Sequence, residues 1–464
     1  MAVSTFFGLQ TSLRGLLAHQ RSLDVTGHNV ANASTVGYSR QEAVLGASLP
    51  QSIPAGARMD GSGAQLGSGV EVAEYRRIRD TFLDVQFRAQ NTVLGDANAK
   101  ARSLEGVELA LAEPGTNGLS AQLNKFWSAW ANVANDGSSV PARQALVEQA
   151  KTVASTFAEL DGQLASIAGQ AADELQSLVR YDPATGAYGQ IGAIARELAQ
   201  VGAAIKDAVL TRQQPLDLLD HRDLLLDKLS EYGSVSTVDL GDGGIRVMFG
   251  GSGAPLVDDG LVDDVSTPGD ERVTWSGDPA DLVSPGGRLG ALKALSDTPD
   301  GIIASFRSEL AAIAEGLAES VNAIHSDRPG GVDFFTFDDT LGAAGLSVAV
   351  TPAGLSTGRT DAAGANDIAL QIAGLRGKDV DGAYQAFVAR IGSESRQNTR
   401  VQQNAEVLAG AVEDRRQSAA GVSLDEEMTN LIRFQRGYQA SARTMSTLDE
   451  MLDVLINRTG RVGL

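Results

Sequence analysis

The sequence has no cysteine among its 464 residues, so it cannot form a disulfide and offers no thiolate as nucleophile or metal ligand. Aromatic residues are scarce, at 5%, and the helical stretches rely on Ala and Leu instead. Basic residues are outnumbered, and a formal net charge of −20 argues against binding to nucleic acid or to an anionic membrane surface. No apolar run approaches the roughly 20 residues that span a bilayer. These absences disfavour thiol chemistry, nucleic-acid binding and membrane insertion.

The N-terminal segment also lacks the marks of a secretory signal peptide. Residues 1–17 have no basic region followed by a continuous apolar core and a small-residue cleavage site. The sequence therefore predicts a protein that stays in the cytoplasm or leaves it without a cleaved signal. Acidic residues are concentrated in the middle, where 234–301 holds twelve Asp and Glu against four Lys and Arg. We expect this region to face solvent.

What the chain does have is an apolar stripe at each end with coiled-coil spacing. Alternating steps of three and four residues place each stripe along one narrow side of a helix, which then needs a partner helix. The stripes, defined here as the assembly seam, comprise Phe6, Leu9, Leu13, Leu16, Leu23, Val30, Leu424, Met428, Leu431, Tyr438, Met445, Leu448, Leu452 and Leu455. Because neither helix can bury its stripe alone, the two ends are predicted to pair with each other or with copies of themselves.

The same periodicity is also typical of core helices in a globular bundle, and this alternative stays open. The narrowness of the stripes and their position at the two ends favour assembly. Apolar burial between two isolated helices is smaller than the conformational entropy lost on ordering them. We therefore expect the terminal helices to fray in a monomer and to become ordered on polymerisation.

Between the ends, helical periodicity alternates with glycine-rich stretches. Residues 45–69, rich in Gly, Ser, Ala and Pro, are predicted to be a loop or extended arm. Short Val-containing runs within 233–290, with Asp242-Gly243 as a hairpin turn, predict antiparallel strands. Further strands are expected at 332–337 and 346–350. Helices are predicted at about 78–111, 141–171, 191–205, 218–229, 303–324, 380–410 and 424–457.

The predicted fold is therefore mainly α with an inserted β domain, in an elongated multi-domain protein whose N- and C-terminal helices pair as a coiled coil. We divide the chain into three domains. The terminal coiled-coil domain is 1–35 with 424–464, the helical body is 36–232 with 291–326 and 366–423, and the outer β-rich domain is 233–290 with 327–365.

One sequence pattern could belong to an enzyme, since Gly354 to Gly358 matches a nucleophile elbow around Ser356. Such an elbow needs a preceding buried strand, a following helix and an activating histidine. This pattern instead follows Pro352 and enters a loop, so a secreted serine hydrolase remains only an alternative.

The histidines give no metal-binding pattern either. None is paired at i, i+4 and none neighbours a cysteine, which leaves no ligand spacing for a metal site. The four are His19, His28, His221 and His325. We expect no catalytic residue, no cofactor and no metal.

Two segments resemble the signatures of bacterial flagellar axial proteins. Residues 31–41, Ala-Asn-Ala-Ser-Thr-Val-Gly-Tyr-Ser-Arg-Gln, are similar to the signature that closes the first helix of those proteins, and 424–443 is similar to their C-terminal signature. The Gly-Tyr-Ser-Arg-Gln ending resembles more narrowly the hook-associated protein 1 family, which forms the hook–filament junction. The residues of this family motif are Asn32, Gly37, Tyr38, Ser39, Arg40 and Gln41.

Interior segments resemble the same family in the same order. They are 218–225, where the family usually has Gln at the position of His221, then 286–292, and 321–325 with Phe334-Phe335 beyond. The stretch after His325 is short, so an additional outer domain of larger members is expected to be missing.

The resemblance implies a structural subunit rather than an enzyme. It implies export through the flagellar type III apparatus without a cleaved signal, and an export chaperone on the C-terminal helix. The subunit would then form a ring-like or helical homo-oligomer that contacts the hook protein and a second junction protein, with terminal helices lining the inner tube. Another axial subunit, such as a hook or distal-rod protein, is the nearest alternative, and a cytoplasmic coiled-coil scaffold is a third.

Overall fold

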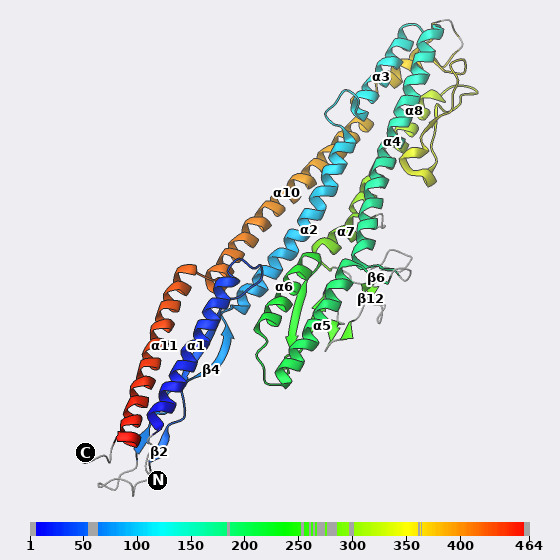
Figure 1. Ribbon diagram of the computed structural model, residues 1–464. Coiled ribbons are helices and arrows are strands. Elements are labelled where there is room, and N and C mark those ends of the chain that lie inside the picture. The colour runs from blue at the N-terminus through cyan, green and yellow to red at the C-terminus, as the bar shows by residue number, and fades with distance from the viewer. Residues whose placement is uncertain are drawn as a thin grey trace.

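The computed structural model describes residues 6–53, 64–182, 186–251, 255–258, 261–262, 265–266, 274–275, 285–296, 301–360, 362 and 364–458. These residues form an elongated, mainly α molecule, as predicted, with both ends of the chain at one end of it (Figure 1). The helices are α1 (Phe7–Ala31), α2 (Thr81–Leu111), α3 (Leu119–Asn135), α4 (Val140–Val179), α5 (Gln190–Leu210), α6 (Leu216–Tyr232), α7 (Gly287–Leu295), α8 (Ile302–His325), α9 (Asp367–Ala373), α10 (Asp379–Ala420) and α11 (Leu424–Asp453).

The strands are short and lie in several separate sheets. A 3-10 segment, η2 (Asp339–Gly345), lies between two of them, and a π-helical turn, η3 (Val454–Arg458), follows α11. The strands are β1 (Gln41–Ala47), β2 (Gln51–Ile53), β3 (Ala64–Leu66), β4 (Val70–Arg77), β5 (Tyr181–Asp182), β6 (Ala187–Tyr188), β7 (Val235–Asp239), β8 (Ile245–Phe249), β9 (Pro255–Asp258), β10 (Leu261–Val262), β11 (Val265–Ser266), β12 (Thr274–Trp275), β13 (Phe335–Thr336) and β14 (Ser347–Val348).

Capping residues explain where the long helices begin. Ser139 precedes α4 and accepts a hydrogen bond from the backbone N–H of Ala142, with a proline in the first turn. Ser423 likewise precedes α11 and accepts from the N–H of Glu426. The first turn of α11 also holds three carboxylates, which favour the positive end of the helix dipole. Local sequence therefore fixes both helix starts.

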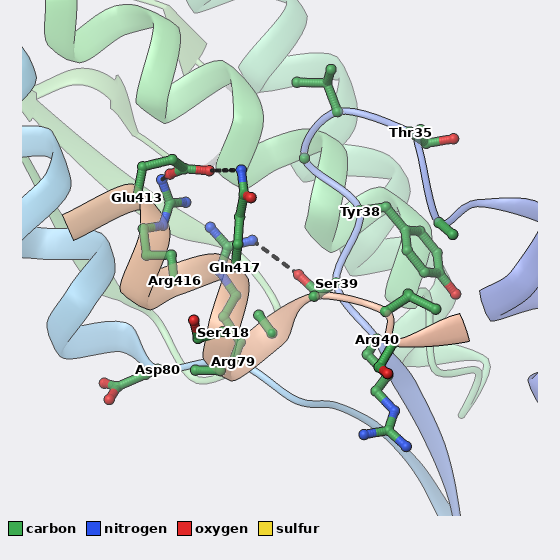
Figure 2. Close-up of a pocket in the computed structure, with 18 of the residues that line it drawn as sticks. Thr35, Tyr38, Ser39, Arg40, Arg79, Asp80, Glu413, Arg416, Gln417 and Ser418 are labelled. Atoms are coloured by element: carbon green, nitrogen blue, oxygen red, sulfur yellow. Dashed lines mark hydrogen bonds and ion pairs between the residues drawn. The ribbon is translucent and has the colours of Figure 1, made fainter. Parts of the chain in front are cut away.

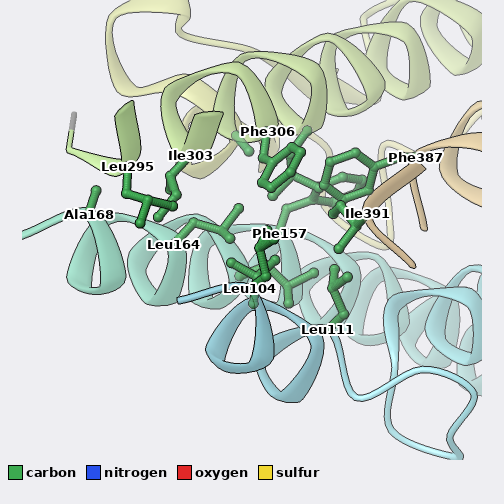
Figure 3. Packing of buried hydrophobic residues seen from close by; sticks show 14 of the residues in the cluster. Leu104, Leu111, Phe157, Leu164, Ala168, Leu295, Ile303, Phe306, Phe387 and Ile391 are labelled. Atoms are coloured by element: carbon green, nitrogen blue, oxygen red, sulfur yellow. The ribbon is translucent and has the colours of Figure 1, made fainter. Parts of the chain in front are cut away.

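The hydrophobic core runs along the body, where α2, α4, α8 and α10 meet (Figure 3). Phe157 of α4 lies among side chains of the other three helices, and Phe306 of α8 meets Phe387 of α10 edge to face, with ring centroids 6.3 Å apart. All three phenylalanines are fully buried. This packing holds the body together as one unit.

The strands of the predicted β-rich domain lie in separate sheets, and the division of the chain into three domains stays a prediction. Strands β7 to β10 form one sheet in the order β10-β9-β8-β7, and the β7–β8 turn is the predicted one at Asp242-Gly243. Strands β13 and β14 pair separately, against α4 and α8 near the end farthest from the termini (Figure 1). Phe335 of β13 is buried in the core at the far end, and the described strands of 233–290 and 327–365 do not share a sheet.

The described part of 45–69, predicted to be a loop or extended arm, contains short strands joined by loop residues. Strand β1 pairs antiparallel with β4 along almost its full length, with an irregularity between Val44 and Leu45, and β2 pairs with β3 beyond it. The resulting ribbon packs along α1. Turn-forming residues dominate the composition here and obscure the short alternation of the strands.

We expect Phe157→Ala to lower the free energy of unfolding by about 3–5 kcal/mol, because it leaves a cavity between helices of the core. Ser166→Ala, on the exposed side of the same helix, is the matched control and should change stability by less than about 0.5 kcal/mol. Denaturant unfolding followed by circular dichroism measures both. Equal effects of the two changes would contradict the packing described.

Candidate assembly site at the terminal helices and their joint

Helices α1 and α11 lie side by side and antiparallel (Figure 1). Gly8 lies against Leu448, Gly15 against Ser441, and Gly437 against His19. A Cβ atom on Gly15 would be 3.0 Å from Ser441 Oγ, and one on Gly437 would be 2.6 Å from His19 Nε2. The two backbones can therefore approach so closely only because these positions are glycine.

The face that α1 buries is made of small and polar residues. Two of its hydroxyls are satisfied within the helix, since Ser22 Oγ donates to Ala18 O and Thr26 Oγ1 donates to Ser22 O. Along its whole described length, α11 buries only Glu427. The buried residues of α1 are Ser12, Gly15, Ala18, Ser22, Thr26 and Asn29.

The seam residues lie mostly outside this contact. Leu448 lies against α1 at Gly8, and seven others are partly covered: Leu9, Leu16, Leu23, Leu431, Tyr438, Met445 and Leu452. The remaining six are exposed: Phe6, Leu13, Val30, Leu424, Met428 and Leu455. The assembly seam therefore stays a prediction, since glycine and serine make the closest contacts described between α1 and α11.

Most seam residues of both helices, with Leu448 as an exception, nevertheless face the same side of the pair. Leu16 follows the contact residue Gly15 by one position, and Leu431 follows the half-buried Asn430. A helix turns about 100° per residue, and in antiparallel helices this step leads to the same side of the pair. The opposite side of α1 carries the β-ribbon, since Arg14 donates to Ser48 Oγ.

The family motif lies where the terminal pair meets the body, a region called the joint here and defined by residues 32–41, 78–84 and 413–427. Tyr38 Oη donates to Asn29 Oδ1 over 2.7 Å, which ties the motif to α1. The N–H of Ser39 donates to Asp220 of α6 over 3.1 Å, and Gln41 Nε2 donates to Asp217 over 2.7 Å. The motif therefore links the first helix to the body.

Two other motif residues shape the turn that leaves α1. Asn32 Nδ2 donates to His28 O over 3.1 Å and so satisfies a carbonyl at the helix end. Gly37 has a φ of +82° and lies where a Cβ atom would be 3.2 Å from Leu224. A larger residue would be strained there in both backbone and packing.

Arg40 connects the segment before β1 to both α11 and α10. Its Nε donates to Glu427 Oε1 and its Nη1 to Glu426 Oε2, both over 2.8 Å. Its backbone N–H donates to Ala420 O, at the end of α10. Glu427 also accepts from Asn29 Nδ2 over 3.3 Å. The one buried side chain of α11 is thus a carboxylate held from the segment before β1 and from α1.

A buried network of ion pairs anchors the joint to the body. Arg416 of α10 reaches Asp84 of α2 at 3.0 Å and Asp227 of α6 at 2.7 Å. All side chains of the network are at most 15% exposed. Its members are Arg77, Arg79, Arg88 and Arg416 with Asp84, Asp220, Asp223 and Asp227.

The network favours the ionised form of the Asp223 carboxylate. Burial alone would raise the pKa of Asp223, but the guanidiniums of Arg79 and Arg77 hold that pKa below its ordinary value. Sequence reasoning missed this network because its partners are far apart in the chain, as with Arg77 and Asp220. No local charge pattern indicates such pairs.

A cavity of about 670 Å³ opens beside the joint, between the loop after α1, the start of α2 and the end of α10 (Figure 2). Its charged walls are already paired. Arg79 donates to Ser39 Oγ, and Gln417 donates to Glu413 (Figure 2). These side chains hold the segments of the joint together. They show no arrangement of a nucleophile beside a base.

The predicted alternative of a serine hydrolase finds no matching geometry around Ser356. The backbone N–H of Ser356 donates to His325 Nε2 over 3.0 Å, and His325 Nδ1 lies 2.7 Å from Val332 O. Both side chains are buried. The imidazole therefore holds two backbone segments together, as expected for a structural turn.

The described part of the chain contains neither a cluster of metal ligands nor a helix that could span a membrane. No group of three or more His, Cys, Asp or Glu side chains there could hold a metal ion. None of the helices described is long and apolar enough to cross a bilayer.

Both terminal helices match family models of the flagellar rod, which places the chain in the class of flagellar axial proteins. Residues 9–38 match the family model described as "Flagella basal body rod protein", and 415–458 match "Flagellar basal body rod FlgEFG protein C-terminal". Residues 104–335, half of the chain, match "Flagellar hook-associated protein FlgK helical domain".

The curated relatives identify the family more narrowly than the models of the terminal segments do. Flagellar hook-associated protein 1 of Bacillus subtilis (strain 168) is 31% identical, over 98% of this chain and 99% of that protein. The protein of the same name from Escherichia coli (strain K12) is 23% identical over 97% and 99%. That of Salmonella typhimurium is 25% identical over 70% of this chain and 58% of that protein. The chain belongs to the flagellar hook-associated protein 1 family.

A solved structure of the flagellar hook junction protein FlgK from Burkholderia pseudomallei is also similar. It is 22% identical, with a TM-score of 0.45, over 55% of this chain and 47% of that chain.

Gly437→Ala and Gly410→Ala form a matched pair, because each adds one methyl group inside a helix. The space around Gly410 is open, so alanine there should stabilise its helix by up to about 1 kcal/mol. At Gly437 the methyl group would meet His19, so α1 and α11 must move apart and unfold more easily. Hydrogen exchange of the α1 amides measures the difference. Equal protection in both variants would contradict the close contact.

Stability should also fall as the pH drops below about 6.5, because burial lowers the pKa of His325 from its ordinary value of 6.5. Below that pH the imidazole of His325 binds a proton more readily in the unfolded chain than in the folded one, so unfolding becomes more favourable. Trp130, whose ring centroid is 6.2 Å from that of His325, reports this region by fluorescence. His325→Gln should flatten the pH dependence even if it lowers overall stability. An unchanged slope in that variant would refute this account.

Proposed function

We propose that this protein is a structural subunit of the bacterial flagellum that joins hook and filament, and that it assembles with copies of itself through the seam on its terminal pair. The observation that carries the proposal is that most seam residues of α1 and α11 lie on one side of the pair, partly or largely exposed. Leu13 is 43% exposed and Met428 is 54% exposed. An apolar surface of this kind is typical of an interface awaiting a partner.

The partners follow from the family and from the exposure of α11. We propose that the subunit contacts the hook protein on one side and a second junction protein on the other. Before assembly, an export chaperone would cover α11, which buries so little in this chain. Export would use the flagellar type III route without a cleaved signal. The role is mechanical, and no enzymatic step belongs to it.

Neighbouring copies also supply what the terminal pair lacks in stability. With one buried side chain in α11, the pair gains little apolar burial of its own. Packing of the seam against adjacent subunits would provide it, which supports the expectation that these helices become fully ordered on polymerisation. Closed or helical arrays arise when such surfaces repeat from copy to copy.

We expect Leu13→Asp or Met428→Asp to abolish incorporation into the flagellum and motility, while circular dichroism of the purified chain stays unchanged. Both side chains are exposed in the chain itself, so a charge there harms only packing with another subunit. Leu109→Asp, at a 75% exposed residue of α2 in the body, is the matched control. Normal flagella in the two seam variants would refute the proposed assembly surface.

Immunogold labelling separates this role from that of a hook or distal-rod subunit. A single band at the tip of the hook supports a junction protein. Labelling along the whole hook supports the alternative.

A further inference from the structure

We propose that neighbouring copies of this chain dock side by side through opposite charges, with two arginines of α11 in one copy against two glutamates of the β-ribbon in the next. The inference rests on the proposed function, because it names the surfaces by which a self-assembling subunit recognises its neighbour. The arginine pair is Arg436 and Arg443, and the glutamate pair is Glu71 and Glu74.

The middle of α11 is basic in an otherwise acidic chain. Residues 428–448 contain three arginines and no Asp or Glu, although the whole chain has a formal net charge of −20. Arg436 precedes Gly437, which lies against α1, and the seam residue Tyr438 follows it. A helix turns about 100° per residue, so Arg436 and the seam lie on opposite sides of the terminal pair. Arg443 is two turns further along the same side, and both arginines are exposed.

The β-ribbon carries two carboxylates on the face that is turned away from α1 and α11. Glu71 and Glu74 of β4 lie opposite Gly46 and Val44 of β1. Leu45, between these two β1 residues, lines the groove where the ribbon meets α1 and α11. Because successive side chains of a strand point to opposite faces, the glutamate pair lies on the other face of the ribbon from that groove.

The charges of both pairs are unmatched within one chain. Among the described residues, no ion pair is formed by the arginine pair or by the glutamate pair. The ribbon's own exposed arginine, Arg76, is already held by Glu42 over 2.9 Å. Since the glutamates face away from the groove beside α11, the arginines of the same chain are not placed to pair with them.

The two pairs also match in spacing. Arg436 and Arg443 are seven residues apart, which is about 10 Å at the α-helical rise of ~1.5 Å per residue. Glu71 and Glu74 are three residues apart, which is also about 10 Å at ~3.3 Å per residue of strand. The irregularity in the ribbon beside Val44 puts both glutamates on one face, where a regular strand would alternate them. Two ion pairs can therefore form at once when α11 lies along a ribbon.

The positions of the two surfaces favour an array over a two-fold dimer. Helix α1 contacts both α11 and the ribbon and lies between them (Figure 1). A contact between two different surfaces leaves one of each free on every dimer, so it repeats from copy to copy into a ring or helix. A two-fold contact between arginine pairs would instead bring like charges together.

The charges contribute specificity more than affinity. Exposed ion pairs stabilise a contact only slightly, whereas opposing like charges exclude a wrong partner or a wrong register. Apolar surfaces such as the seam supply the burial but tolerate sliding. The arginine and glutamate pairs then determine which sides of two copies meet.

Cross-linking in assembled flagella tests the contact directly, because a chain without native cysteine gives no background. A variant carrying both Arg436→Cys and Glu74→Cys keeps the second ion pair. Treated with a bismaleimide linker, it should give a ladder of dimers, trimers and longer products in sheared flagella. Each single variant should stay monomeric. The absence of a ladder, or dimers from Arg436→Cys alone, would overturn the proposal.

Exchange of the charges tests whether the pairing itself matters. Arg436→Glu with Arg443→Glu should cause loss of incorporation and of motility, and so should Glu71→Arg with Glu74→Arg. The chain with all four changes should regain both, because every copy again presents matching charges. If the fourfold variant stays defective, the arginines serve a different partner, such as an acidic chaperone, and the contact between copies is wrong.

A matched control separates the contact from the effect of net charge. Lys125→Glu with Arg400→Glu changes the net charge by the same amount as the two α11 substitutions, at exposed positions of α3 and α10 in the body. This variant should be incorporated normally. A loss as large as that of the α11 variant would refute a specific role for the arginine pair.

The outcomes also distinguish this contact from the proposed function. Absence of the parent chain from sheared flagella would refute the proposed function and the contact with it. Presence of the parent chain at the tip of the hook, with neither a ladder nor rescue by charge exchange, would refute the contact alone.

Discussion

The structure depends on a close contact between helices from opposite ends of the chain. Gly15 and Gly437 let α1 and α11 approach until backbone atoms of one helix nearly touch side chains of the other. Because the first and last helices lie together, the rest of the chain must run out along the body and return. The long antiparallel course of α2 and α10 follows from that constraint (Figure 1).

The same contact determines which residues remain outside. Small and polar side chains such as Ser22 and Thr26 fill the inner face of α1, so most seam residues of both helices are left on one outer side. A monomeric globular protein would place them the other way round. The arrangement is economical only when other copies cover the apolar side, and this links the fold of one chain to the polymer proposed for it.

Much of this fold could be predicted from the sequence, because long helices have a strong signature. The spacing of Leu146, Val153, Leu160 and Leu164 defined α4, and all four are buried. The β-ribbon of β1 and β4 could not be predicted, since its strands carry charged residues and flank a segment of turn-forming composition. Periodicity gives the apolar side of a helix but not the partner of that side. For that reason the sequence indicates the apolar stripes of the terminal helices but not the face of small residues with which α1 meets α11.

The joint shows the same difference between local features, which the sequence indicates, and long-range partners, which it does not. Local sequence singled out the motif from Asn32 to Gln41, and the structure places it in the joint. The motif could not reveal its partners, because Ser39 meets Asp220 and Arg40 meets Glu427 only after the chain has folded back. Long-range pairs of this kind leave no periodic signal along the sequence.

The ion pairs of the joint are better explained by geometry than by stability. Burying charge costs desolvation that the pairing only roughly offsets, so apolar residues of similar size would hold the joint equally well. Apolar packing, however, tolerates sliding and rotation, whereas Arg416 must meet both Asp84 and Asp227 at once. Removing one partner leaves a buried charge unpaired, which costs about 3–5 kcal/mol. Each displaced geometry of the joint is thus strongly disfavoured, because Arg77 of the ribbon also meets Asp220 and Asp223 of α6.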